Sequence, residues 1–441
     1  MIRDLINYFM TSGDEVLALL MEHIQLTTLA LLAAIAIGIP LGILISYIKP
    51  ASKPVLAFAN LVQAIPSMAL LGLAIPVLGI GMKPAVFLVV IYSLLPIIKN
   101  TYAGLMNISP QMLEAAEGIG LTKRQILFKV RIPMALPVIM TGVRISAVSA
   151  VGLMTLAAYV GGGGLGDLVF SGIRLVNNVK ILAGAIPACI LALLVDRIFA
   201  AVEVLVTPIS LLPGNNKQEK KKRKGREKLV AGVAVVLVAA LIGVTLFQPA
   251  KKSDLRIASM DFSENEILAY MLSEAIETKT GLSVDTVLDL GGSSVCVTAI
   301  NSGEIDGYIE YTGTIYVSIL DQPAISDVEK VYEESKAGMM ELYGLEVLNS
   351  LNVNNTYTLS TTKEIAEKYG LKTISDLKKW NGQLRATTTL TFLNREDGLP
   401  GVKSLYGLEF AEETGVDGAP RYTALMSGEG RLLHRRPSEK I

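Results

Sequence analysis

Long apolar runs fill the first half of the chain, and short charged segments separate them. Between residues 15 and 247 we predict six membrane spans, each near the ~20 residues needed to cross ~30 Å of hydrocarbon. They lie at about 22–48, 55–79, 84–106, 134–159, 181–206 and 229–247. Prolines occur inside the first five, and membrane helices tolerate them when neighbouring helices satisfy the freed carbonyl groups. The pattern therefore predicts a packed bundle rather than isolated anchors.

From Ser253 onward the pattern changes to alternating strands and helices. The segment 255–259, LRIAS, reads as a buried strand, and apolar residues recur at helical spacing across 264–280 until Gly281. Such alternation is typical of a doubly wound sheet, where ligands bind at loops beyond the strand ends. We therefore predict an all-α membrane bundle of five spans, a sixth tethering span, and an α/β domain.

Lysine and arginine predict the orientation, because cytoplasmic loops are enriched in them. The loops after the first, third and fifth predicted spans are basic, and the last of these contains seven cations between Lys220 and Lys228. All three loops fall on one side of the membrane. We therefore expect residues 107–133 inside the cell and everything after Phe247 outside. The run at 220–228 also fits a nucleic-acid or anionic-lipid patch, but its place between two spans favours a topology signal and linker.

Composition narrows the function classes. The 441 residues carry no net charge, and the mean hydropathy of +0.48 is too high for an ordinary soluble protein. Two cysteines, Cys189 in an apolar run and Cys296 in the α/β part, predict no disulfide. The N-terminal segment lacks a basic region and a cleavage site, so we expect no cleavable signal peptide.

An enzyme is disfavoured by the same inventory of residues. With only His23 and His434, the sequence offers no metal-spaced His/Cys set and no catalytic triad, so we expect no catalytic or metal-binding residues. The phosphate-binding motif G-x-x-x-x-G-K-[ST] is absent, and the glycines at 161–164 lack its lysine. We expect no cofactor, no nucleic-acid partner and no ATP hydrolysis by a P-loop of this chain.

A short charged segment between the third and fourth predicted spans carries the most specific motif. Ser109 and Pro110 predict a helix start, with Ser109 as N-cap, and Gly118 and Gly120 allow a turn after it. The segment resembles the EAA loop of bacterial ABC importer permeases, in which a coupling helix fits a groove on a cytoplasmic ATPase. The residues that match this ATPase-coupling motif are Glu114, Ala115, Ala116 and Gly120.

Two further stretches, QAIPSMALLGL at 63–73 and YVGGGGLGDLVFSG at 159–172, are similar to permeases of the compatible-solute branch. This resemblance covers about the first 210 residues. It implies a separate cytoplasmic ATPase subunit and a second permease copy, forming a homodimer in a bacterial cell membrane. The expected division is a permease domain at 1–212, a basic linker with the sixth span at 213–252, and a substrate-binding domain at 253–441.

The last domain resembles the substrate-binding proteins of importers for glycine betaine, carnitine and choline. The matching pieces are LGGSS at 290–294, SGEIDGYIEYTGT at 302–314 and NNTYTL at 354–359. The resemblance implies a two-lobed periplasmic-binding-protein-like fold, with a second lobe at about 352–430. Tyrosine faces attract a quaternary ammonium, which has no N–H to donate, through cation–π contact. The implied ligand-binding residues are Ser293, Ser294, Tyr311, Thr312, Asn355 and Tyr357.

The resemblance leaves the substrate open. A relative with this fused arrangement imports ergothioneine, whose trimethylammonium group needs the same cage of tyrosines. A third reading is a membrane-anchored solute sensor without transport, which the coupling loop disfavours. The leading expectation is the membrane and substrate-binding subunit of an ABC importer.

The C-terminal end departs from the family pattern. ALMSGE at 424–429 repeats AINSGE at 299–304, but GRLLHRRPSEKI follows it instead of a strand such as IDGYIEY. We therefore expect no strand in this tail, a reading frame that is truncated or shifted near Gly430, and poor or no substrate binding. A native basic tail is the alternative.

Overall fold

A computed structural model describes residues 1–174, 177–211, 253–416 and 432–435, with a few single residues between these ranges. The chain divides into two compact units. One comprises Met1–Val169 and Leu182–Lys252, and the other comprises Phe170–Ile181 and Ser253–Ile441.

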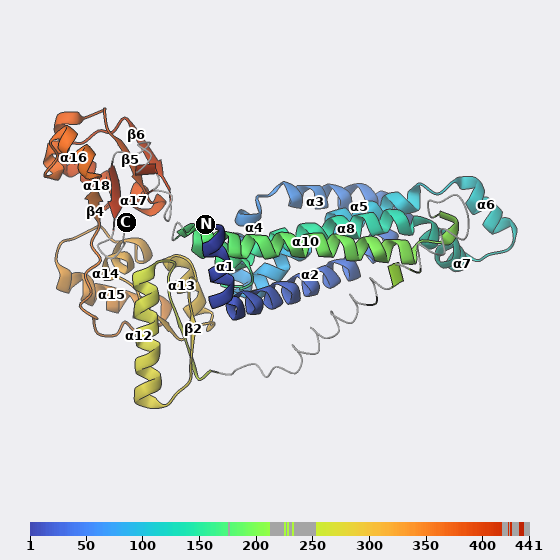
Figure 1. The fold of residues 1–441 in the computed structure, drawn as a ribbon, viewed down its shortest axis with the longest axis horizontal. Helices are drawn as coiled ribbons and strands as arrows, with labels where there is room; N and C mark the ends of the chain where they lie inside the picture. The colour runs from blue at the N-terminus through green and yellow to red at the C-terminus, as the bar shows by residue number, and fades with distance from the viewer. Residues whose placement is uncertain are drawn as a thin grey trace. The chain divides into compact units, whose positions relative to one another are not determined.

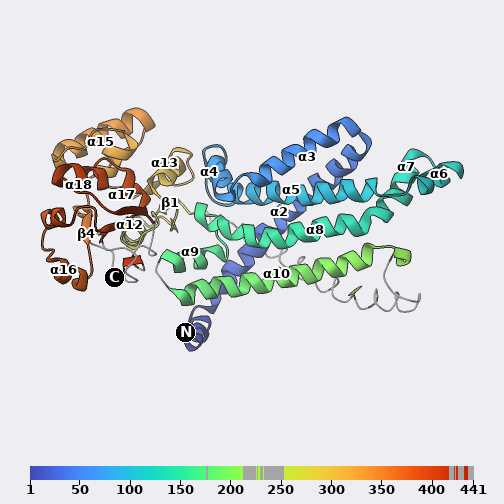
Figure 2. The ribbon, with the colours of Figure 1, turned by 90° about the horizontal axis from the view of Figure 1, so that it is seen from above.

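The first unit is built from helices (Figures 1 and 2). The helices of this part of the chain are α1 Ile2–Thr11, α2 Gly13–Tyr47, α3 Lys49–Ala64, α4 Ser67–Leu78, α5 Met82–Met106, α6 Pro110–Gly118, α7 Lys123–Ile126, α8 Ile132–Met154, α9 Gly166–Arg174 and α10 Asn178–Val206. The end of α9 and the start of α10 fall in the segment assigned to the second unit. Helices α2, α5, α8 and α10 run side by side in both views. A π-helical turn, Leu127–Arg131, joins α7 to α8, and a 3₁₀ turn, Thr155–Val160, follows α8.

The number of membrane spans differs in part from the prediction of five plus one. Within the described residues, three segments are long and apolar enough to cross a membrane: Gly13–Tyr47, Met82–Met106 and Lys123–Val160. A bent pair, α3 and α4, makes four if it counts as one span. The fifth predicted span forms the 29-residue helix α10. The predicted sixth span and the basic run before it lie outside the described residues, apart from isolated positions.

The second predicted span is not one continuous helix. Helices α3 and α4 meet at a bend of 100° around Ile65 and Pro66. Ile65 adopts φ −70° and ψ 131°, because the ring of a following proline disfavours the helical region. Pro66 itself has no N–H to continue the α3 hydrogen-bond ladder. The predicted span at 55–79 is therefore a bent pair of helices, and its count as one span is not confirmed.

Close helix packing forms the core of the first unit. Leu26 and Ala30 of α2, Leu88 of α5 and Met154 of α8 belong to one buried apolar cluster. A side chain added at Gly142 of α8 would lie 2.6 Å from the Asn100 Cβ and 2.6 Å from the Pro96 carbonyl oxygen of α5. Helix α8 therefore depends on glycine there to approach α5, as membrane helix interfaces commonly do.

The predicted coupling segment forms one end of the bundle. Helices α6 and α7 lie at the opposite end from α1 and α4 in both views (Figures 1 and 2). The predicted helix start is confirmed: Ser109 is the N-cap residue and Pro110 occupies the first turn, although the Ser109 side chain makes no capping hydrogen bond.

The second unit contains two small sheets. The first is parallel, in the order β2-β1-β3, and consists of β1 Leu255–Ala258, β2 Val284–Val287 and β3 Gly307–Tyr308. Its helices are α12 Ser263–Thr280, α13 Ser293–Asn301, α14 Thr312–Thr314 and α15 Val328–Tyr343. The predicted strand at 255–259 and the predicted helix ending at Gly281 are both confirmed, with Gly281 at φ +72°.

The second sheet has the order β4-β7-β5-β6 and includes part of the C-terminal tail. Its strands are β4 Thr358–Ser360, β5 Arg385–Thr388, β6 Glu412–Gly415 and β7 Leu432–Arg435. Strand β7 pairs antiparallel with β4 and parallel with β5, and Leu432 is buried in the adjoining apolar cluster. The expectation of no strand in the tail was therefore wrong. Backbone hydrogen bonds to β4 and β5 and the burial of Leu432 hold this strand in the sheet, although its side chains do not alternate between apolar and polar. Helices α16 Lys363–Tyr369, α17 Leu390–Asn394 and α18 Leu399–Tyr406 complete this part.

Candidate functional site

The candidate ligand site begins at the carboxyl edge of the parallel sheet. Asn265, fully buried in α12, accepts a hydrogen bond from the Met260 N–H (2.7 Å) after β1. Its amide nitrogen donates to the Ile309 carbonyl (2.8 Å) after β3. This one side chain therefore fixes the two loops that follow neighbouring strands, and those loops carry Phe262 and Tyr311.

Tyr311 is the best-defined of the predicted residues. Its hydroxyl donates to the Glu264 carboxylate over 2.6 Å, and its ring lies 5.9 Å from the Phe262 ring at a tilt of 31°. Burial raises the pKa of Tyr311 well above its ordinary value, and the hydrogen bond to Glu264 raises it further. The Tyr311 ring is therefore neutral at physiological pH and faces its surroundings as an uncharged π-system.

The predicted residues Asn355 and Tyr357 come from the segment before β4. Asn355 lies close enough to Tyr311 to oppose the rise in the pKa of that phenol. Neither amide atom of Asn355 has a well-formed hydrogen bond within the part of the chain that the structure describes, and both atoms are buried. Buried amides normally have partners, so this side chain is poised for a ligand.

The Tyr357 ring contacts both an aromatic ring and a cation. The Phe392 ring of α17 meets it edge to face at 5.0 Å, and the Arg395 guanidinium lies 5.7 Å from its centroid. Sequence reasoning missed both Phe262 and Arg395. The sequence around Arg395 gives no sign of a ligand site. Only the fold brings Arg395 to the predicted segment 302–314.

Arg395 links the two parts of the second unit. It forms a two-point ion pair with Asp397, at 2.7 and 2.6 Å, and is only 10% exposed. Its remaining N–H groups point at the Gly313 carbonyl and the Thr314 hydroxyl of α14, each at 3.4 Å. A single buried guanidinium thus connects the segment after α17 with the segment after β3.

The other predicted residues lie on the same sheet edge. Ser293 and Ser294 occupy the first turn of α13, and the Ser293 hydroxyl points at the Met260 sulfur over 3.4 Å. Ser294 is exposed. Thr312 begins α14, and its carbonyl accepts a hydrogen bond from Ser335 at 3.4 Å.

Carboxylates give the site a negative character. Glu264 accepts from the Tyr311 hydroxyl, and Glu310 accepts from the Tyr311 N–H at 2.9 Å. Burial, together with the charges of Glu310 and Asp261, raises the pKa of the Cys296 thiol one helical turn from Ser293. Aromatic faces beside fixed carboxylates suit a cation that cannot donate hydrogen bonds. The described residues contain no cluster of three or more His, Cys, Asp or Glu side chains that could hold a metal ion.

The predicted coupling loop is a second candidate site, at the end of the helical bundle. Glu114, Ala115 and Gly120 are exposed, whereas Ala116 of α6 is buried. Gly120 adopts φ +85°, which favours glycine, and Thr122 with Gln125 forms a capping box that starts α7. Three apolar side chains are exposed around it: Met112 (40%), Ile119 (78%) and Phe128 (59%). We call these three side chains the apolar tip of the loop.

Known families match both units. Residues 34–207 match the family described as the binding-protein-dependent transport system inner membrane component. Residues 253–433 match the substrate-binding domain of ABC-type glycine betaine transport systems.

One similar protein matches both the permease region and the substrate-binding domain, whereas others match the permease region alone. Over 391 residues, 88% of this chain and 70% of the relative, the sequence is 31% identical to the ergothioneine transport permease/ergothioneine binding protein EgtU of Helicobacter pylori. The permease region is 39% identical, over 47% of this chain and 95% of that protein, to the glycine betaine/carnitine/choline permease OpuCB of Bacillus subtilis. It is 43% identical to the osmoprotectant import permease OsmW of Salmonella typhimurium, over 46% of this chain and 98% of that protein.

Proposed function

Because the chain belongs to the family of ABC importer subunits in which a permease is fused to its substrate-binding domain, we propose that it imports a small trimethylammonium compound. The observation that carries this proposal is the environment of Tyr311. A neutral aromatic ring, two carboxylates and the unsatisfied Asn355 amide meet at one sheet edge. The proposed contacts to the ligand come from Tyr311, Thr312, Asn355 and Tyr357, and from Ser293 and Ser294 at the start of α13.

Two substrate groups have comparable support. Glycine betaine, carnitine and choline are suggested by the family of the binding domain and by the OpuCB relative. Ergothioneine is suggested by the EgtU relative. All four carry a trimethylammonium group, so the cage chemistry is common to them.

A binding panel on the full chain tests the proposal. Since strand β7 of the tail pairs with β4 and β5, we expect saturable binding in place of the poor binding inferred from the tail sequence. At least one of glycine betaine, carnitine, choline and ergothioneine should bind, measured by calorimetry. The matched controls lack the methyl groups: glycine for glycine betaine, and the unmethylated thiol-histidine for ergothioneine. Hydration of their N–H₃⁺ groups opposes entry into an aromatic cage, so we expect them to bind at least tenfold more weakly, a difference of ~1.4 kcal/mol. Equal binding of methylated and unmethylated ligands would contradict the proposal.

The proposed partners follow from the exposed loop and the family. We infer that Glu114, Ala115, Ala116 and Gly120 couple the permease to a separate cytoplasmic ATPase subunit, and that two copies of this chain form the transporter. The apolar tip formed by Met112, Ile119 and Phe128 supports this docking role. The proposed domain limits remain 1–212, 213–252 and 253–441.

We expect the binding domain to lie outside the cell, because the basic loops predict the opposite side for residues 107–133 and 220–228. In a background without Cys189 and Cys296, Lys363→Cys should react with a membrane-impermeant maleimide in intact cells. Gly225→Cys should react only after the cells are opened. Both positions are exposed, so access to reagent rather than burial decides the outcome. Labelling of position 225 but not 363 in intact cells would reverse the proposed orientation.

A further inference from the structure

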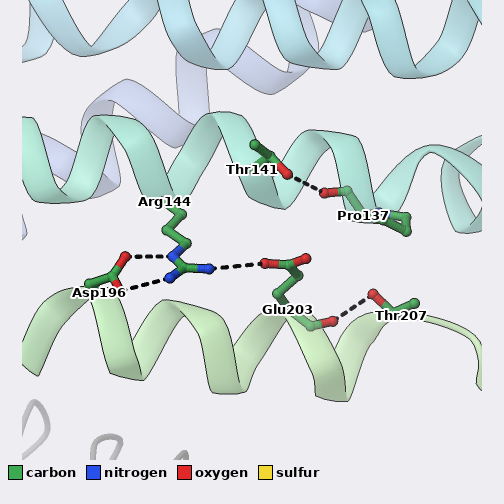
Figure 3. Close-up of polar contacts among 6 residues, drawn as sticks. All are labelled: Pro137, Thr141, Arg144, Asp196, Glu203 and Thr207. Atoms are coloured by element: carbon green, nitrogen blue, oxygen red, sulfur yellow. Dashed lines mark hydrogen bonds and ion pairs between the residues drawn. The ribbon is translucent and has the colours of Figure 1, made fainter. Parts of the chain in front are cut away.

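An arginine of α8 and two acids of α10 meet in the helical bundle of the first unit (Figure 3). The Arg144 guanidinium of α8 donates two hydrogen bonds to the Asp196 carboxylate of α10, at 2.5 and 2.7 Å. Its third nitrogen lies 3.9 Å from the Glu203 carboxylate, two helical turns further along α10. Arg144 stands at the thirteenth of 23 residues in α8, near its middle, whereas Glu203 lies in the last turn of α10, which ends at Val206.

This cluster is not sealed inside the bundle. The side chains of Arg144, Asp196 and Glu203 are 37%, 39% and 29% exposed. A cavity of about 490 Å³ opens beside them, and the same face of α8 adds Thr141 and Ser149 to its wall. Thr141, Ile145 and Ser149 follow each other at four-residue spacing and are all exposed.

Lipid cannot cover such a face without a large penalty. A charged side chain at the centre of a bilayer costs at least ~2.5–3.5 kcal/mol, and such residues face a bundle interior or a water-filled cavity. Arg144 and Asp196, with the two hydroxyl groups, therefore mark this wall as aqueous, and Glu203 extends it toward the C-terminal end of α10. Water at the middle of a permease is what a pathway for polar solutes requires.

The charges of the wall complement a zwitterion. One cation and two anions leave a net charge of −1. Asp196 already accepts two hydrogen bonds from the Arg144 guanidinium. Glu203, held only by a 3.9 Å contact, is the carboxylate available to another cation. We propose that this cavity is a transit site for the imported substrate, with the quaternary ammonium beside Glu203 and the substrate carboxylate sharing the Arg144 guanidinium.

Such a site would be weak. Among the described residues that line it there is no aromatic ring to form a cage of the kind proposed around Tyr311. A pathway needs this property, because a solute must leave its intermediate positions as readily as it enters them. The outer domain would therefore set the half-saturating concentration, while the cavity would influence the maximal rate. The inference rests on the proposed import of trimethylammonium compounds.

The test compares Glu203→Gln with Glu203→Asp in the full chain assembled with its ATPase in proteoliposomes. Glutamine keeps the size and removes the charge, whereas aspartate keeps the charge. With radiolabelled glycine betaine or ergothioneine, as the binding panel selects, we expect Glu203→Gln to lower the maximal uptake rate about tenfold. The half-saturating concentration and the amount of assembled transporter should not change. Glu203→Asp should stay within about twofold of the wild type.

Glu15→Gln supplies the matched control, because it makes the same chemical change on an exposed position of α2. An unchanged maximal rate in Glu203→Gln would overturn the transit site, as would a loss that parallels a loss of assembled transporter. Equal defects in the aspartate and glutamine variants would also overturn it, because they would indicate a structural role. If the wild type imports none of the trimethylammonium compounds, the proposed function fails before these variants are compared.

Discussion

Deletion of residues 114–120 should abolish substrate uptake and leave ligand binding by the substrate-binding domain unchanged. The segment forms the exposed end of the helical bundle, where Glu114 and Ala115 face solvent and Gly120 turns the chain at φ +85°. If this tip seats in the ATPase, its loss disconnects ATP hydrolysis from the movement of the permease helices. Uptake and ATPase activity in proteoliposomes, with calorimetric binding on the same preparation, measure both halves of the prediction.

Charge reversal gives a gentler version of the same prediction. Glu114→Lys places a cation where the coupling motif has an anion, and we expect at least a tenfold loss of uptake. The Glu114 side chain is exposed and makes no hydrogen bond among the described residues, so the substitution should not destabilise the fold. Glu15→Lys, a charge reversal near the opposite end of the bundle, serves as control. Normal uptake by a Glu114→Lys transporter with bound ATPase would remove the assigned role of the loop.

The parts of the fold that follow from local sequence were predictable. The helix that begins at Ser109 and Pro110 and the helix that ends at Gly281 both depend on residues within a few positions of each boundary. Strand β1 follows from a short apolar run. In these places the local backbone preferences and the burial pattern agree, so the sequence alone identifies the element.

Other features depend on partners far away in the chain. The Arg144–Asp196 ion pair joins residues 52 positions apart, and Arg395 reaches Thr314 across 81 positions. Strand β7 has no alternating pattern and forms because β4 and β5 offer free edges on either side of it. No local pattern specifies which distant edge or side chain will be nearby. The bend at Pro66 is different, because its cause is local and the proline was visible in the sequence.

The candidate cage shows the same division. The sequence identified Tyr311 and Tyr357, whereas the fold added Phe262 beside the first and Arg395 beside the second. Arg395 matters for the chemistry, because a guanidinium already lies near one face of Tyr357. A trimethylammonium group must therefore use the opposite face of that ring, or Arg395 must move when ligand binds. Tyr311, whose ring lies beside the Phe262 ring and whose hydroxyl donates to Glu264, is the stronger candidate for direct contact.

The largest effect on binding is expected from Tyr311→Ala combined with Tyr357→Ala. Each cation–π contact is worth ~0.5–2 kcal/mol, so loss of both should weaken binding of the selected trimethylammonium ligand about a hundredfold. Tyr332→Ala is the control for the loss of a ring, because Tyr332 lies on α15 with its hydroxyl directed at the Leu348 carbonyl. Calorimetry on the full chain measures the affinity, and thermal unfolding shows that the variants remain folded.

Tyr311→Phe distinguishes the contribution of the Tyr311 hydroxyl from that of its ring. The substitution keeps the π-system and removes the hydrogen bond to Glu264. If the ring face holds the ammonium, affinity should fall less than tenfold. Tyr316→Phe is its matched control, because the Tyr316 hydroxyl donates to Glu334 over 2.7 Å, much as Tyr311 donates to Glu264 over 2.6 Å. Folded double-alanine protein that binds as tightly as the wild type would show that the ligand lies elsewhere. A Tyr311→Phe defect as large as that of Tyr311→Ala would instead assign recognition to the hydroxyl and its carboxylate partner.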